Sequence, residues 1–403
     1  MSTSKLHNKA IVAFSGGLDT SMLVPYMREH YGVEDITTCI VDTGAMTADD
    51  KDSVSARSRE VRADRHVYID ATKAYYDEIL KYLIFGNVSR DGYPLCVGSE
   101  RLIQARETIN HARENNITLM AHGSTGAGND QYRFDLVAIV EGQNIVSIAP
   151  VREHNIKREF SQNFLKERGI TVPEKSKYSY NVGLWGVSIG GEETHQSEGL
   201  IPEEAWHGQI NPALNQVTLK ITFEQGEPVA VDTGEQVING PVDVIRAIGS
   251  IGSDLGIGRH YHLGTSIPGK KGRLAYESPA ADIIYEAHRT LEKHVLTQSQ
   301  IFFKQGVAQE FGRLIHEAHF CDPLADDIRA LLKSSQKRVS GVCTVHLKPH
   351  HISSVTANTP YDLLKAGGSV YGEFSDFYSA NDAQGSAKLH AYEQFLYHQI
   401  SRN

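Results

Sequence analysis

The segment AFSGGLDTS, residues 13–21, holds the residue types best suited to binding an anion, and it follows a short apolar run. Gly16 and Gly17 permit a tight turn in which successive backbone N–H groups face one point. A helix that begins after the turn would add the positive end of its dipole. Hydroxyl donors flank the glycines: Ser15, Thr20 and Ser21. This combination predicts a phosphate-binding loop.

Asp19 is an unusual residue in such a loop, because its carboxylate would repel a phosphate. A divalent cation that bridges Asp19 to the phosphates would resolve the conflict, and Mg²⁺ is the natural candidate. No lysine follows the glycines, so the loop is not of the Walker A type. A capped helix after a Gly-Gly turn is the structural alternative. The full pattern resembles the loop of ATP pyrophosphatases, which adenylate a substrate oxygen and release pyrophosphate.

A second polar loop, HGSTGAGNDQYRFD at residues 122–135, also follows an apolar run. Thr125, Asn129, Asp130 and Arg133 offer a hydroxyl, an amide, a carboxylate and a guanidinium group. This set suits an amino-acid substrate, because an ammonium pairs with a carboxylate and a carboxylate pairs with an arginine or a hydroxyl. The structural alternative is a glycine-rich loop whose Asn-Asp pair caps the next helix.

Both loops are expected at one edge of a sheet. Between residues 9 and 150, β-branched apolar runs alternate with helix-like segments, which is typical of a parallel sheet covered on both faces. Ligands of such sheets bind at the carboxyl ends of the strands. The expected strands are residues 10–14, 36–41, 66–69, 118–123 and 144–149. The expected helices lie around residues 20–31, 71–85, 99–115 and 130–141.

The chain changes character at about residue 176, and an α+β region is expected from there. A β-hairpin with a glycine-containing turn is predicted at residues 216–237 and a strand at 341–349. Helices are predicted near residues 241–251, 280–296, 298–318 and 323–337.

The last predicted helix, residues 387–400, has apolar residues at helical spacing. It is expected to bury four of them against a neighbouring subunit, because a lone amphipathic helix gains its stability from packing. These are Leu389, Tyr392, Phe395 and Leu396. Docking of the helix on its own domain is the alternative.

Composition narrows the possible functions. The 403 residues include 40 Lys and Arg against 49 Asp and Glu, and the net charge of −9 argues against binding to nucleic acid or to anionic membranes. No run of apolar residues is long enough for a signal peptide or a membrane span, so a cytoplasmic location is expected. The 4 cysteines form no C-x-x-C pair, and the 19 histidines show no metal-binding spacing. The expected partners are small molecules.

Eight separate segments resemble, in the same order, the argininosuccinate synthases, a family that joins citrulline to aspartate at the expense of ATP. They are AFSGGLDTS (13–21), YPL (93–95) with Arg101, HGSTGAGNDQYRFD (122–135), YS…LWGVSIGG (178–191), GIGR (256–259), KKGR (270–273), YE (276–277) and AHRTLE (287–292). The resemblance implies an α/β fold with a parallel-sheet nucleotide-binding domain of ATP-pyrophosphatase type at residues 1–175. An α+β synthetase domain is then expected at 176–380 and an oligomerisation helix at 381–403, in a homotetramer.

The resemblance also implies the site residues. ATP, a substrate bound with Mg²⁺, would contact Ala13, Phe14, Ser15, Gly16, Gly17, Leu18, Asp19, Thr20, Ser21, Val41 and Gly123. Aspartate would contact Thr125, Asn129 and Asp130. Citrulline would contact Tyr93, Asn129, Arg133, Ser179, Ser188 and Tyr276. The residues expected to act in catalysis are Asp19, Asp130 and Arg133.

The implied activity is a ligase that forms citrullyl-AMP and then argininosuccinate, in arginine biosynthesis. The citrulline side departs from the family pattern, because Gly190 and Gly264 replace acidic residues and Val97 and Gly98 replace a hydroxyl pair. In one interpretation, Glu192, Glu193 or water makes the contacts that the replaced acidic residues would make. Another is a substrate with an acylated α-nitrogen, for which Lys270, Lys271 and Arg273 could meet an extra carboxylate.

Two further alternatives remain from the sequence alone. An adenylating enzyme that thiolates or otherwise modifies tRNA would usually need catalytic cysteines or a basic surface, and neither is visible. A non-catalytic nucleotide sensor would not need Thr125, Asn129 and Asp130 together.

Overall fold

The computed structural model describes residues 8–174, 176–368, 371–373 and 375–401. Its first sheet has five parallel strands in the order β3-β2-β1-β4-β5. They are β1 (Lys9–Ala13), β2 (Asp35–Asp42), β3 (Arg65–Asp70), β4 (Leu119–His122) and β5 (Val146–Ile148). Each strand lies at a predicted apolar run, so the predicted parallel sheet is confirmed.

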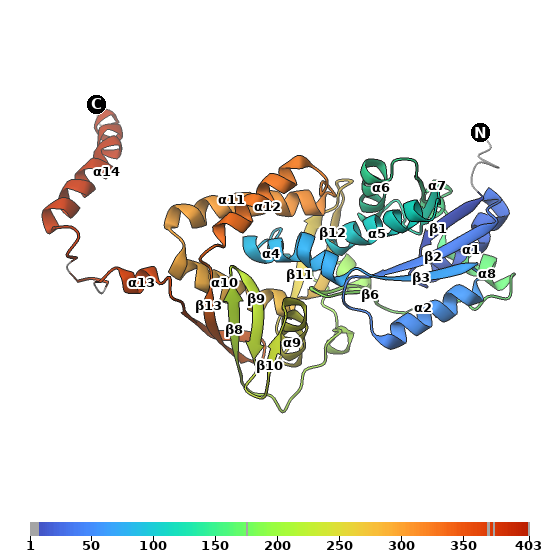
Figure 1. The fold of residues 1–403 in the computed structure, drawn as a ribbon, viewed down its shortest axis with the longest axis horizontal. Coiled ribbons are helices and arrows are strands. Elements are labelled where there is room, and N and C mark those ends of the chain that lie inside the picture. Colours follow the sequence, from blue (N-terminus) through green and yellow to red (C-terminus); the bar gives the residue numbers. More distant parts are fainter. Residues whose placement is uncertain (1–7, 175, 369–370, 374, 402–403) are drawn as a thin grey trace.

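Helices cover both faces of this sheet (Figure 1). Along β1, Ala10 and Val12 enter one apolar cluster with the first helix, whereas Ile11 enters the other cluster. This alternation follows from the pleat of a strand that is buried on both sides. The helices are α1 (Leu18–Tyr31), α2 (Ala48–Glu60), α3 (Thr72–Tyr75), the π-helical turn η1 (Tyr76–Leu80), α4 (Lys81–Gly86), α5 (Glu100–Glu114), α6 (Asp130–Glu141), α7 (Pro150–Glu153) and α8 (Arg158–Lys166).

A second sheet has five antiparallel strands in the order β10-β9-β8-β13-β14. They are β8 (Val217–Glu224), β9 (Glu227–Asp232), β10 (Val237–Asn239), β13 (Gly341–Lys348) and β14 (His351–Asn358). Its helices are α9 (Pro241–Asp254), α10 (Pro279–Val295), α11 (Gln298–His316) and α12 (Pro323–Ser335). The predicted hairpin, the strand at 341–349 and all four helices are confirmed, and so is the predicted α/β fold class.

A third, smaller sheet has four antiparallel strands in the order β11-β12-β7-β6, and the sequence patterns did not predict it. The strands are β6 (Ser179–Gly183), β7 (Gly186–Gly190), β11 (Arg259–Thr265) and β12 (Lys271–Glu277). Two short 3₁₀ helices follow β7, namely η2 (Glu192–His195) and η3 (Glu203–Ala205). This sheet supplies one wall of the site described below.

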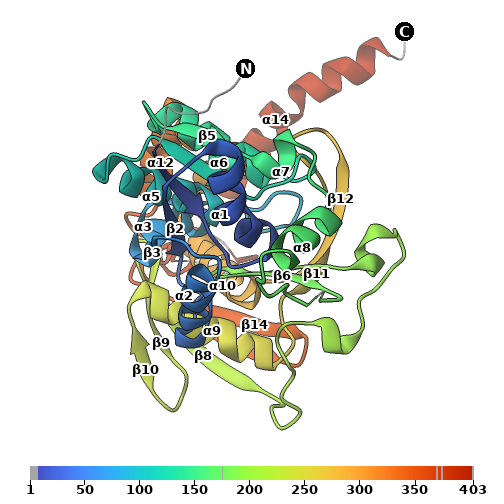
Figure 2. The same ribbon diagram turned by 90° about the vertical axis from the view of Figure 1, so that its right-hand side faces the viewer.

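The C-terminal region leaves the body of the molecule. After α13 (Leu363–Ala366), helix α14 (Ala380–Ile400) stands away from the sheets in both views (Figures 1 and 2). It begins with a capping box between Ser379 and Asp382, and none of its residues is buried. The predicted helix is confirmed and is longer than expected, whereas docking on its own domain is wrong. Burial against a neighbouring subunit stays a prediction.

Among the described residues, no helix combines the length and the apolar character needed to cross a membrane.

Candidate active site

The loop after β1 has the geometry expected of an anion-binding turn. Gly16 has a φ of +75°, in the left-handed region that favours glycine. Helix α1 begins two residues later, and no side chain caps its first N–H groups. Thr20 Oγ1 lies 3.3 Å from Ser15 Oγ, so two hydroxyl groups stand side by side at the turn. Uncapped N–H groups and neighbouring hydroxyls at a helix N-terminus suit a phosphate.

A cavity of about 330 Å³ opens beside this loop, and we call it the glycine-loop cavity. It lies where β1, β2 and β4 end, as the rule for parallel sheets predicts. Six of the predicted ATP-binding residues line it: Ala13, Phe14, Ser15, Thr20, Val41 and Gly123. A Cβ on Gly123 would lie 3.0 Å from Thr20 Cγ2, so the glycine allows the end of β4 to approach the start of α1.

The other predicted ATP-binding residues shape the turn without lining the cavity. Leu18 is buried in the apolar cluster under α1. Ser21 is fully buried, and its hydroxyl donates to the carbonyl of Gly16 at 3.2 Å. The backbone of Gly16 and Gly17 forms the turn itself.

Asp19 lies half-buried in the first turn of α1, and its Oδ1 accepts a 3.4 Å hydrogen bond from Ser161. Burial raises the pKa of Asp19, and Ser161 and Arg158 oppose this only in part. A cation at the carboxylate would offset the cost of burying it. No cluster of three or more possible metal ligands occurs within the described residues. Because Mg²⁺ bound to phosphates needs only one or two carboxylates, Asp19 fits such an ion.

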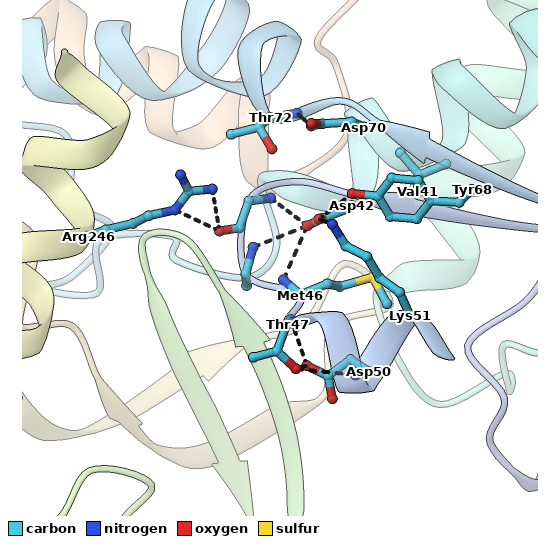
Figure 3. Close-up of polar contacts among 12 residues, drawn as sticks. Val41, Asp42, Met46, Thr47, Asp50, Lys51, Tyr68, Asp70, Thr72 and Arg246 are labelled. Atoms are coloured by element: carbon cyan, nitrogen blue, oxygen red, sulfur yellow. Dashed lines mark hydrogen bonds and ion pairs between the residues drawn. The ribbon is translucent and has the colours of Figure 1, made fainter. Parts of the chain in front are cut away.

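The segment after β2 is held by a carboxylate that the sequence analysis missed (Figure 3). Asp42 Oδ1 accepts hydrogen bonds from the N–H groups of Gly44, Ala45 and Met46, at 2.7, 3.1 and 3.3 Å. Its other oxygen accepts a 2.7 Å bond from Tyr68. Burial disfavours the charged form, but these donors hold the pKa of Asp42 below its usual value. Asp42 therefore fixes the backbone beside Val41.

Arg246 of α9 connects the loop after β2 to the second sheet's helices. Its Nε and Nη2 donate to the carbonyl of Gly44 at 3.3 and 3.0 Å (Figure 3). The loop after β2 is therefore tied both to the first sheet and to a helix of the second.

A second cavity, of about 450 Å³, lies between the first and third sheets, and we call it the inter-sheet cavity. The predicted substrate residues that line it come from distant parts of the chain: Tyr93, Thr125, Asn129, Asp130, Arg133 and Ser188. Its far wall is formed by residues of β11 and β12, among them His262, Gly264 and Arg273. Ser124, Asp130 and Asn181 line this cavity and the glycine-loop cavity alike. The two cavities therefore share a wall.

Asp130 is the charged centre of the shared wall. Its carboxylate pairs with Arg101 at 3.2 Å and with Arg133 at 2.8 Å. Desolvation opposes ionisation, but the two arginines hold the pKa of Asp130 below its usual value. Arg101 also donates to Asn181 at 3.0 Å, which links the first domain to β6. Arg101 belongs to one of the segments that resemble the argininosuccinate synthases, but the sequence analysis predicted no role for it.

Arg133 is almost fully buried, at 5% exposure, and its Nε has no hydrogen-bond partner. Its Nη2 donates to the carbonyl of His316 at 3.3 Å. Gly98 makes room for this guanidinium, because a Cβ there would lie 2.7 Å from Nη2. Burial, with Arg133 and Arg90 nearby, lowers the pKa of His316 to about 3. No motif in the sequence indicated His316, which is the last residue of the long helix α11.

Two predicted citrulline residues lie outside the lining of this cavity. Tyr276 packs edge-on against Tyr93, with ring centroids 4.9 Å apart, and its hydroxyl donates to the carbonyl of Gly92. Ser179 donates to the carbonyl of Gly190 at 3.4 Å, across the β6–β7 pair. Tyr276 therefore supports Tyr93 of the wall, whereas Ser179 contacts the backbone of a residue outside the lining.

The acidic residues suggested as substitutes also lie elsewhere. Neither Glu192 nor Glu193 lines the inter-sheet cavity. Glu193 is engaged by the hydroxyl of Tyr178 at 2.9 Å and by Lys177 at 3.2 Å. Asp130 is therefore the one carboxylate in the lining of this cavity within the described chain.

Comparison with known proteins agrees with this architecture. Residues 9–171 match the family model described as the arginosuccinate synthase N-terminal HUP domain, and residues 178–397 match the arginosuccinate synthase C-terminal domain. The argininosuccinate synthase of Xanthomonas campestris pv. campestris is 35% identical over 97% of this chain and 98% of its own length. Those of Xylella fastidiosa and Methanocaldococcus jannaschii are 34% and 32% identical, covering 99% and 96% of this chain and 99% and 97% of their own lengths. The chain therefore belongs to the argininosuccinate synthase family of enzymes, as its motifs indicated.

Proposed function

We propose that this enzyme joins citrulline and aspartate to form argininosuccinate through a citrullyl-AMP intermediate, releasing AMP and pyrophosphate, in arginine biosynthesis. The observation that carries the proposal is the wall shared by the two cavities, formed by Ser124, Asp130 and Asn181. A nucleotide in one cavity and a ureido substrate in the other would meet there. No covalent enzyme intermediate is needed, so catalysis would rest on positioning and electrostatics.

ATP is assigned to the glycine-loop cavity. The ureido oxygen of citrulline attacks the α-phosphorus, and the leaving pyrophosphate is stabilised by the hydroxyls and N–H groups of residues 15–21. Asp19 would hold Mg²⁺ on the phosphates, and the ion would neutralise charge that develops on them.

The amino-acid substrates are assigned to the inter-sheet cavity. Aspartate is assigned to Thr125, Asn129 and Asp130. Because the arginines lower the pKa of Asp130, this carboxylate is suited to orienting the ammonium of aspartate and is a weak base. Citrulline is assigned to Tyr93, Asn129, Arg133 and Ser188 in the lining of this cavity, together with Ser179 and Tyr276, which lie outside the lining. The unpartnered Nε of Arg133 is a ready donor for its carboxylate.

The test is product analysis with citrulline labelled by ¹⁸O at the ureido oxygen. We expect AMP and pyrophosphate as primary products, with the label in the phosphate of AMP. ADP and orthophosphate, or unlabelled AMP, would contradict the citrullyl-AMP route. A nucleotide sensor would bind ATP and form no product under the same conditions.

A citrulline with an acylated α-nitrogen is the second candidate substrate, and the lining of the inter-sheet cavity favours it. Its one carboxylate, Asp130, is already paired with two arginines. Around it stand Arg133, Arg273, His262 and His316. An unpaired ammonium is costly to bury in such surroundings, whereas an amide nitrogen is neutral. A kcat/KM for citrulline ten times or more above that for N-acetyl- and N-succinylcitrulline would reject this candidate.

The proposed assembly is a cytoplasmic homotetramer with domains at residues 1–175 and 176–380 and an oligomerisation helix at 381–403. All 4 cysteines are free in the structure, which agrees with a reducing compartment. The exposed apolar side chains of α14 supply a surface for contact between subunits.

A further inference from the structure

Glu100, the first residue of α5, is a buried carboxyl group that none of the proposed roles uses. It is 1% exposed. Its Oε2 accepts a 2.9 Å hydrogen bond from the hydroxyl of Thr43, and its Oε1 accepts a 2.9 Å hydrogen bond from the N–H of Leu184. Thr43 follows β2, and Leu184 lies in the turn between β6 and β7. One carboxyl group therefore joins the edge of the first sheet to a hairpin of the third.

Gly183 makes this contact possible. A Cβ at this position would lie 2.2 Å from Oε1 of Glu100 and 2.7 Å from its Cδ. Both distances are far below van der Waals contact, and the carboxyl group is enclosed on all sides. Any side chain at residue 183 would therefore push the hairpin away from α5.

The two segments joined by Glu100 belong to the two cavities. On one side, Thr43 adjoins Asp42, which fixes the backbone beside Val41 of the glycine-loop cavity. On the other side, Asn181 lies three residues before Leu184 and lines both cavities. Asn181 donates to Ser188 at 3.4 Å, and Ser188 lines the inter-sheet cavity.

We propose that Glu100 is a positioning residue that locks the β6–β7 hairpin to the loop after β2 and so keeps the two cavities in register for transfer of the adenylyl group. This inference rests on the proposed function, because that function assigns ATP to one cavity and the amino-acid substrates to the other. It adds a residue that touches neither substrate and acts through Thr43 and Leu184.

The electrostatic surroundings indicate which form of Glu100 makes these contacts. Burial raises its pKa to about 8, and Arg101, Thr43 and the N–H of Leu184 counteract this only in part. The other ionisable groups that face it are Asp42, Tyr75 and Cys96. At neutral pH the carboxyl group is therefore mostly protonated. In that form the oxygen beside Thr43 carries the proton and donates to the hydroxyl instead of accepting from it, and a glutamine can make the same two contacts with its oxygen and its amide.

The experiment compares Glu100→Ala, Glu100→Gln and Gly183→Ala in the full chain. We expect Glu100→Ala and Gly183→Ala to lower kcat and to raise the KM for the ureido substrate, with a loss of about tenfold or more in kcat/KM. The equilibrium affinity for ATP should change by less than about threefold in both. Glu100→Gln should stay within about threefold of the wild type in every constant. Glu107→Gln, on the same helix and in the lining of neither cavity, is the matched control.

Hydrogen exchange of the peptide that spans residues 179–190 gives a readout independent of turnover. Exchange should become faster in Glu100→Ala and stay slow in Glu100→Gln. Wild-type kinetics in Glu100→Ala, or equal damage in the alanine and glutamine variants, would overturn the inference. If the wild-type enzyme forms no argininosuccinate, the proposed function fails. Unchanged exchange in Glu100→Ala would separately reject the lock.

Discussion

The two cavities of this enzyme are built in different ways. The glycine-loop cavity lies at the ends of β1, β2 and β4, so one sheet sets most of its walls. The inter-sheet cavity combines the loop at residues 93–98 and the start of α6 with strands of the third sheet. Its shape exists only when the two sheets are docked.

The difference shows which contacts determine the geometry of each cavity. Parallel strands bring their carboxyl ends together whatever their side chains are, so the geometry of the glycine-loop cavity follows from topology. The geometry of the inter-sheet cavity depends on a few contacts between domains, among them Arg101 with Asn181 and Arg246 with Gly44. Substitutions at the first cavity should affect the chemical step, and substitutions at the second should mainly affect how the ureido substrate is held.

The largest expected effect is at the glycine loop. Asp19→Asn should lower kcat by about two orders of magnitude or more, because the metal-phosphate contact would lose its charge. Steady-state kinetics at saturating ATP and Mg²⁺ measure this. Asp49→Asn, in the exposed first turn of α2, is the control and should keep wild-type turnover. Near-wild-type kcat in Asp19→Asn would reject the role of Asp19 in holding the metal.

A substitution at the inter-sheet cavity should have a smaller and more selective effect. Gly98→Val would displace the guanidinium of Arg133, because the Cβ alone lies 2.7 Å from Nη2. We expect kcat/KM for the ureido substrate to fall about tenfold, while the KM for ATP changes by less than about threefold. Gly306→Ala, where a Cβ meets no atom within 4 Å, is the matched control. If kcat/KM fell equally for ATP and for the ureido substrate, the two cavities would not bind separate substrates as proposed.

The lock between the two cavities predicts a pH dependence of stability. In the folded chain the pKa of Glu100 is about 8, against an ordinary value of 4.5. The unfolded chain therefore releases this proton first, and Glu100 makes the folded state progressively less stable as the pH rises from about 4.5 to about 8. In this window, the free energy of unfolding, measured by urea denaturation at several pH values, should depend differently on pH in Glu100→Gln and in the wild type. The two slopes against pH should differ by up to about 1.4 kcal/mol per pH unit. Parallel curves for the two proteins would contradict a raised pKa.

The smallest effect on turnover is expected from α14, because none of its residues lines either cavity. Removing residues 380–403 should lower the mass of the assembly in light scattering, because the exposed apolar side chains of the helix would lose their partners. We expect kcat for the truncated chain to stay within about threefold of the wild type. An unchanged assembly mass would show that α14 does not hold the subunits together.

The sequence predicted the first sheet and its loops well, because β-branched runs and a glycine turn are local signals. Helix α2 was not predicted, because it is polar, has Ser58 as its only buried residue and so shows no apolar spacing. The capping box of Thr47 and Asp50 was the signal that could have found it. The site residues of the first two loops were found in the same way, from motifs after apolar runs.

The third sheet could not be predicted for a physical reason. Strands β6 and β7 are short and include Gly183, Gly186 and Gly190, and β7 pairs with β12, about ninety residues further along the chain. The roles of Glu100, Asp42 and His316 arise only from that docking or from contacts across loops. Single residues of this kind carry no motif in the sequence.

The shared wall of Ser124, Asp130 and Asn181 has a consequence for how this enzyme could change its substrate. A substitution in that wall alters both cavities, so it would affect nucleotide binding and amino-acid binding together. Its free-energy effect would also not add to that of a second substitution in either cavity. The opposite wall, with Gly264 and Gly272, touches only the inter-sheet cavity. Evolution could therefore widen or recharge that wall, and so admit a new amino-acid derivative, while the chemistry of nucleotide cleavage is inherited intact.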